Sequence, residues 1–167
     1  MTPQTTLAYA YLTTPDTAFD SAGVYKTDFK LMPDDAKPLL DEMRAVAKEA
    51  FGNDAGKATL PYKVDDETGE LTFKTKSKYM PRFVDASGKG VDPGSMPPVY
   101  GGSEARLAGN IQAYNQSGNK GVTLQLAAVQ VISIAERQGG ADFGAVEGGF
   151  VASNDNAPDA DGASYNF

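Results

Sequence analysis

Several segments of this 167-residue chain alternate between apolar and polar residues, with the two-residue period of a β-strand. In the segment 71–79, for example, Leu71 and Phe73 alternate with Lys74 and Lys76. The period changes in residues 33–53, where apolar side chains recur at helical spacing: Leu39, Met43, Val46 and Ala50, widened by Leu40, Ala47 and Phe51. We therefore expect an all-β fold with one capping helix.

The strand-like segments number about five, and large loops separate them. They cover residues 6–12, 23–31, 61–84, 104–115 and 121–136, the third broken by a turn at 65–69 and the last two joined by a hairpin loop. Five antiparallel strands with one helix suggest a small barrel, for which the OB-fold is the common nucleic-acid-binding design. A β-sandwich is the alternative, since period and strand count do not separate the two.

Charge is distributed unevenly along the chain, whose net charge is -7. All 15 Lys and Arg, and 17 of the 22 Asp and Glu, lie at or before Arg137. We expect a domain over residues 1–137 and a flexible acidic tail over 138–167, because periodicity stops there and Gly, Ala, Asn and Asp dominate.

Several classes of function need residues that this chain lacks. With no histidine and no cysteine, it has neither the commonest general base and metal ligand nor a thiol nucleophile. No phosphate-binding or nucleotide-binding glycine motif occurs, and no apolar run is long enough to span a membrane. We expect no enzyme activity, no cofactor and no metal, and the missing signal peptide and cysteines favour a cytoplasmic protein.

A basic band in residues 74–89 points to a polyanionic partner. Lys74, Lys76 and Lys78 share one face of a strand, about 6.8 Å apart, which suits successive phosphates of an extended single strand. Nearby cations and aromatic side chains complete the candidate surface: Lys26, Tyr79, Arg82, Phe83 and Tyr114, with Tyr25 a weaker candidate. The alternative is that the lysines protect an exposed edge strand from aggregation. Strand parity with Phe73 also favours core positions for Tyr79 and Phe83, unless Pro81 resets the register.

Several motifs, in this order, resemble the single-stranded DNA-binding proteins of short-tailed bacteriophages. They are "AYAYLTTPDTAF", "GVYKTDFKL", "LTFKTK", "SEARLAGNIQAYN", "GVTLQLAAVQVI" and a final acidic stretch that ends in phenylalanine. The resemblance runs from about Leu7 to Phe167. One difference is that the helix precedes "LTFKTK", whereas the usual OB order places it between the third and fourth strands.

The resemblance implies an OB-fold core that binds single-stranded DNA without sequence preference, protects and anneals single strands, and acts in phage DNA replication and recombination. It implies DNA contacts for Lys74 and Lys76 and base stacking for Tyr114. It also implies docking of the phage DNA polymerase and helicase–primase by the acidic tail, which contains Asp155, Asp159 and Asp161 and ends in Phe167. We add Tyr165 to this docking segment, because an aromatic side chain near a flexible end suits a partner pocket. The expected location is the cytoplasm of the infected bacterial host, and a homodimer is one expected assembly. The alternative function is a protein-binding or structural phage β-barrel with no nucleic-acid role.

Overall fold

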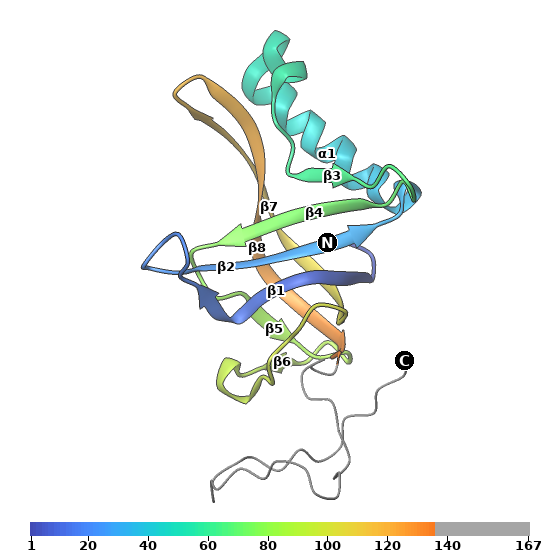
Figure 1. The fold of residues 1–167 in the computed structure, drawn as a ribbon, viewed down its shortest axis with the longest axis vertical. Coiled ribbons are helices and arrows are strands. Elements are labelled where there is room, and N and C mark those ends of the chain that lie inside the picture. Colours follow the sequence, from blue (N-terminus) through green and yellow to red (C-terminus); the bar gives the residue numbers. More distant parts are fainter. Residues whose placement is uncertain (136–167) are drawn as a thin grey trace, which may run out of the picture. The chain divides into compact units, whose positions relative to one another are not determined.

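The computed structural model describes residues 1–135, which form one sheet wrapped into a ring beside a single long helix (Figure 1). The elements are β1 (Thr5–Asp16), β2 (Val24–Leu31), α1 (Pro33–Phe51), β3 (Tyr62–Val64), β4 (Leu71–Ser77), β5 (Arg82–Val84), β6 (Gly90–Val91), β7 (Glu104–Gln116) and β8 (Asn119–Ser133), with short 3₁₀ helices at Gly52–Lys57 and Pro93–Ser95. The predicted domain boundary at 137 and the predicted tail lie outside the described residues.

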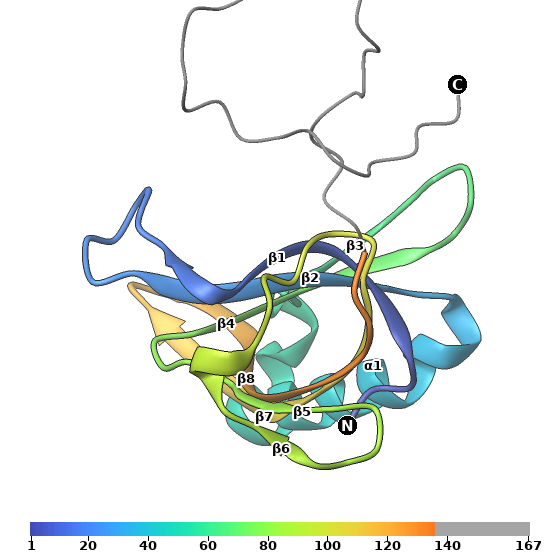
Figure 2. The same ribbon diagram turned by 90° about the horizontal axis from the view of Figure 1, so that it is seen from below.

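Five strands close the ring, in the order β1, β2, β4, β8 and β7. Four of the contacts are antiparallel, whereas β4 meets β8 in parallel through only two residue pairs, Thr75 with Leu124 and Lys76 with Gln125. The contact between β1 and β7 is equally short. Figure 2 shows the strands curving around the ring. The predicted OB-type architecture is confirmed. The ring is not entirely antiparallel, and only two residue pairs join its strands at β4–β8 and at β1–β7.

The alternation in β4 produces the two sides of the ring wall. Leu71, Phe73 and Thr75 are buried, whereas Lys74 and Lys76 are exposed, as the strand period predicted. The Phe73 ring stacks on Phe29 of β2, with ring centroids 5.2 Å apart. Pairing of offset aromatic rings adds to the burial of their apolar surface, so this face of β2 and β4 belongs to the core.

The helix α1 packs its apolar side against the ring. It buries Ala36, Met43 and Ala47, which are spaced by two turns and one turn. The predicted stripe was correct at Met43 and Ala47 but wrong at Ala50, which is exposed. Along the chain, α1 follows β2 and precedes β4, the second and third strands of the ring, as the order of the sequence motifs predicted.

The hairpin between β7 and β8 is longer than the sequence predicted. The loop expected over 116–121 is a two-residue turn, in which Ser117 and Gly118 both have positive φ, 51° and 86°. Two such residues form the tight turn whose twist matches that of the flanking strands. Pairing therefore continues to Gln116 and Asn119, and Figure 1 shows the hairpin extending beyond the ring.

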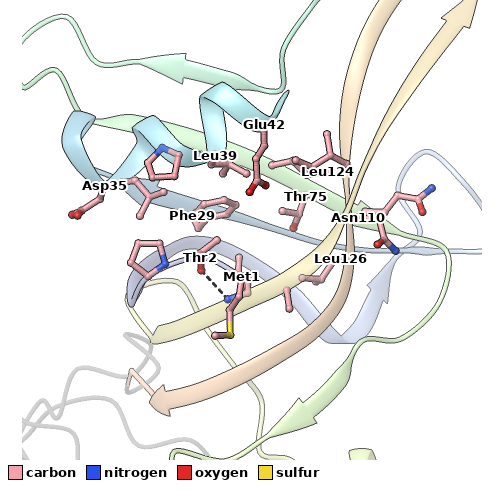
Figure 3. Close-up of a pocket in the computed structure, with 18 residues that line it drawn as sticks. Met1, Thr2, Phe29, Asp35, Leu39, Glu42, Thr75, Asn110, Leu124 and Leu126 are labelled. Carbon is pink, nitrogen blue, oxygen red and sulfur yellow. Dashed lines mark hydrogen bonds between the residues drawn. The ribbon is translucent and has the colours of Figure 1, made fainter. Parts of the chain in front are cut away.

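A cavity of about 210 Å³ lies between α1 and the ring (Figure 3). Apolar residues such as Phe29, Leu39 and Leu126 line it, and Asp35 and Glu42 on α1 also border it. No lysine or arginine is among its lining residues. This cavity therefore has neither the charge nor the exposed rings that a nucleic-acid strand requires.

Candidate nucleic-acid interface

A groove of about 1030 Å³ lies over the outer surface of β2 and β4. Asp16 at the end of β1 borders it, with Phe19 and Asp20 of the loop that connects β1 to β2. The β7–β8 hairpin borders it through Tyr114, Gln116, Val122 and Thr123. Thr59 and Pro61 add a further part of the wall. The groove thus combines a sheet surface with two projecting loops, and both kinds of element are available to an elongated ligand.

Strand register aligns the polar residues of the groove in rows. Lys26 on β2 stands opposite Lys76 on β4, and Asp28 stands opposite Lys74. The rows extend to β1, where Tyr11 is opposite Lys26 and Tyr9 is opposite Asp28. Because directly opposed side chains are about 5 Å apart at Cβ, each row brings an aromatic ring and at least one lysine into mutual reach.

Lys26 is held in place by three neighbours. It forms an ion pair with Asp16, and its ammonium group lies 5.5 Å and 5.7 Å from the ring centroids of Tyr9 and Tyr11. The two rings are themselves 5.0 Å apart. The Lys26 ammonium, helped by the Ala18 N–H, holds the pKa of Asp16 below its usual value. At neutral pH, the charge of Lys26 is therefore partly compensated by Asp16.

Asp28 is a half-buried carboxylate within the row of lysines. Burial raises its pKa, and the ammonium groups of Lys74, Lys26 and Lys63 oppose that rise without cancelling it. With Asp16 and Asp20, it gives the groove three carboxylates against the three ammonium groups of Lys26, Lys74 and Lys76. The positive and negative charges of these groove residues therefore balance. Loss of the Asp28 charge would leave the groove with a net positive charge.

Tyr114 lies near the tip of the hairpin, with 37% of its surface exposed. Its pairing partner across the hairpin is Gly121. A Cβ atom at Gly121 would lie only 2.4 Å from the Tyr114 hydroxyl oxygen and ring carbon Cζ. Glycine therefore lets the Tyr114 ring lie directly against the backbone of β8, and the exposed part of this side chain borders the groove.

The structure brings together four of the eight predicted DNA-binding residues, Lys26, Lys74, Lys76 and Tyr114. Lys78, Tyr79 and Arg82 are exposed but do not line the groove. The assignment of Phe83 to base stacking is wrong, because its side chain is 0% exposed. Phe83 pairs with Val129 of β8 and with Val91, so its ring belongs to the core.

Two exposed aromatic residues of the groove were not predicted as binding residues. Tyr9 is 42% exposed and Phe19 is 99% exposed. Tyr9 sits in a recognisable strand, but a bulge at Ala8 shifts the register so that its ring faces the groove. Phe19 lies in a polar loop between Asp16 and Asp20, and an apolar ring at such a position was the available sequence signal.

The tail residues Asp155, Asp159, Asp161, Tyr165 and Phe167 lie outside the described part of the chain. Within residues 1–135, no cluster of three or more Asp or Glu side chains is arranged to hold a metal ion. None of the helices in the same part of the chain is both long and apolar enough to cross a membrane.

Comparison with known families and curated proteins gives no match to this chain. Solved structures do match. The single-stranded DNA-binding protein gp2.5 of bacteriophage T7 is 25% identical, with a TM-score of 0.69 over 91% of this chain and 97% of gp2.5. The single-stranded DNA-binding protein of bacteriophage Enc34, in complex with single-stranded DNA, is 17% identical, with a TM-score of 0.65 over 81% and 86% of the two chains. A second structure of the Enc34 protein gives 16% identity and a TM-score of 0.65, over 83% of each chain.

All of these similar proteins are described as DNA-binding proteins and none as an enzyme, in agreement with the expectation for this chain. The similarity extends over most of both chains in each comparison. The resemblance to phage single-stranded DNA-binding proteins that the sequence motifs indicated is confirmed in the fold.

Proposed function

We propose that this protein binds single-stranded DNA along the groove over β2 and β4, with little preference for sequence. The observation that carries the proposal is the position of the groove. It lies on the second and third strands of the ring, between the loop that follows the first strand and the hairpin that joins the last two. OB-folds bind oligonucleotides on this face. The similar phage proteins, one of them in complex with single-stranded DNA, add support.

The chemistry of the groove suits single strands better than duplexes. Lys74 and Lys76, on the same face of β4, can contact successive phosphates. Tyr114 and Tyr9 offer ring surfaces on which unpaired bases can stack, and Phe19 offers a third. Every base has such a surface to stack, so recognition of this kind is tolerant of sequence. A duplex keeps its bases stacked on each other and cannot use these rings.

A double variant, Lys74→Ala with Lys76→Ala, tests the proposal. Each lost phosphate contact lowers the slope of log affinity against log salt by about 0.7, so the slope for oligo(dT) should fall by about 1.4. The matched control is Lys37→Ala with Lys48→Ala, which removes two exposed lysines of α1 outside the groove. Unlabelled duplex as competitor tests strand preference. Equal slopes for the groove variant and the wild type would show that the two lysines do not contact phosphates.

The finer roles are also part of the proposal. We propose action in phage DNA replication and recombination, by protecting and annealing single strands, and docking of the phage DNA polymerase and helicase–primase by the C-terminal segment. The acids at 155, 159 and 161 and the aromatic residues Tyr165 and Phe167 supply the chemistry for docking, because aromatic anchors dominate many protein interfaces. Phe167→Ala should weaken capture of the phage polymerase while oligo(dT) affinity is unchanged. Unchanged capture would remove the docking role of Phe167.

A further inference from the structure

A second cleft, of about 630 Å³, adjoins the groove at the β7–β8 hairpin. Three residues line both spaces: Thr59, Tyr114 and Gln116. The second cleft adds the lysines Lys57 and Lys120, neither of which the sequence motifs indicated. Tyr114 therefore lies where the groove and the second cleft meet. A ligand that extends along the groove past the Tyr114 ring enters the second cleft.

The two lysines converge on one carboxylate. The Lys120 Nζ lies 2.5 Å from one oxygen of Asp54, and the Lys57 Nζ lies 3.2 Å from the other. Both ammonium groups hold the pKa of Asp54 below its usual value, so Asp54 is ionised at neutral pH. The cluster has two positive charges and one negative charge. It therefore retains one positive charge for an anion even while Asp54 is paired.

Backbone hydrogen bonds fix the cleft to the hairpin. The Thr59 N–H donates to the Lys120 carbonyl at 3.0 Å, and the Val122 N–H donates to the Thr59 carbonyl at 2.9 Å. The Lys120 ammonium group also lies over the Phe51 ring at the end of α1, 5.9 Å from its centre, an arrangement in which the ring attracts the cation. The positive groups of the second cleft thus have a defined position relative to Tyr114.

We propose that the bound single strand continues past Tyr114 into this cleft, where Lys57 and Lys120 bind the phosphates that follow the stacked base. The proposal rests on the function proposed above and extends it to a second phosphate subsite. Asp54 holds the two lysines together in the empty protein and competes with phosphate for them. The site engages strands long enough to reach beyond Tyr114, whereas a strand that occupies only the β2–β4 groove does not touch it.

The experiment compares oligo(dT) of increasing length, from about 4 to about 16 nucleotides, the range that single OB-folds occupy. Lys57→Gln with Lys120→Gln should lower the salt slope by about 1.4 for the long oligonucleotides and leave it unchanged for the shortest that bind. Lys37→Gln with Lys48→Gln on α1 is the control of equal charge. Thermal melting of each variant establishes that the domain is folded.

Asp54→Asn provides a second test with the opposite sign. Removal of a unit charge about 7 Å from a phosphate in water corresponds to roughly a threefold change in affinity. Long oligonucleotides should therefore bind Asp54→Asn about threefold more tightly at low salt, with the short ones unaffected. A merely structural role for the cluster would give weaker binding at every length.

The outcomes separate this proposal from the proposed function. If the wild type binds no oligo(dT), the proposed function fails and the extension fails with it. If the wild type binds, but the lysine variant changes short and long oligonucleotides alike or changes neither, the second subsite is refuted and the groove retains its function. A loss confined to long oligonucleotides, with the gain in Asp54→Asn, supports the subsite.

Discussion

Replacement of Asp28 by asparagine should strengthen binding of single-stranded DNA. Asp28 is paired in register with Lys74, and the Cβ atoms of such a pair are about 5 Å apart, so a phosphate bound at that lysine lies roughly 7 Å from the Asp28 carboxylate. The repulsion between two unit charges at this distance is about 0.6 kcal/mol in water and about 2.4 kcal/mol at an effective dielectric constant of 20. These limits correspond to affinity gains from roughly threefold to roughly sixtyfold for Asp28→Asn.

The same residue predicts how affinity depends on pH. Burial raises the pKa of Asp28 despite the nearby lysines, whereas the pKa values of Asp16 and Asp54 are lowered. As pH falls through the raised pKa, Asp28 loses its charge first and the groove becomes more positive. Wild-type affinity should therefore rise as the pH falls through this raised pKa, and Asp28→Asn should lack this rise.

Stability should follow the same protonation. Because the pKa of Asp28 is higher in the folded than in the unfolded state, its contribution to the free energy of unfolding is fully present below the unfolded value. That contribution is lost as pH rises through the raised folded value. Asp28→Asn should show no such loss.

The assay is fluorescence anisotropy with oligo(dT), because thymine has no group that titrates in this pH range. The control is Glu49→Gln on α1, which removes one negative charge from an exposed site outside the groove. Salt should shrink the gain, since the screening length is about 8 Å at 0.15 M. Equal affinities for the wild type, Asp28→Asn and Glu49→Gln at low salt would refute a phosphate path beside Lys74. So would the same pH dependence in the wild type and the asparagine variant.

Substitutions at three further positions, 114, 121 and 83, test the aromatic assignments. Tyr114→Ala should weaken binding by about 1–3 kcal/mol, whereas Tyr114→Phe should bind nearly as well because the ring is kept; equal losses in both would assign the effect to the hydroxyl. Gly121→Ala should displace the Tyr114 ring, and adding it to Tyr114→Ala should cost little more affinity; additive losses in the double variant would contradict the contact. Phe83→Ala should lower the free energy of unfolding by about 3–5 kcal/mol, measured by urea denaturation, without changing the affinity of the folded protein; weaker binding at unchanged stability would return Phe83 to the interface.

Local periodicity was enough to predict the features that depend on neighbouring residues. Side chains two apart in a strand share a face, so the burial of Phe73 and the exposure of Lys74 and Lys76 followed from their order in the chain. The helix at Pro33–Phe51 followed from its change of period, and Gly52, directly after its last residue, has a positive φ of 54° that glycine adopts readily. The OB-type ring was one of two architectures that these elements allowed.

Tyr79 and Phe83 show what only the tertiary structure decided. They have the same parity as Phe73, yet Tyr79 is 81% exposed and Phe83 is fully buried. The strand β4 ends at Ser77, and β5 begins a separate pairing with β8, in which Phe83 meets Val129. A partner 46 positions away in sequence, not the local alternation, sets the burial of Phe83.

The composition of the groove has the same origin. Tyr9 depends on a bulge in β1, and Lys57 and Lys120 meet at Asp54 only because the segment at Thr59 pairs with the hairpin. Such contacts join residues far apart along the chain, and their register is selected by the packing of the whole ring. The sequence motifs could therefore indicate lysines and a tyrosine for DNA binding, but the path between them is a property of the folded ring.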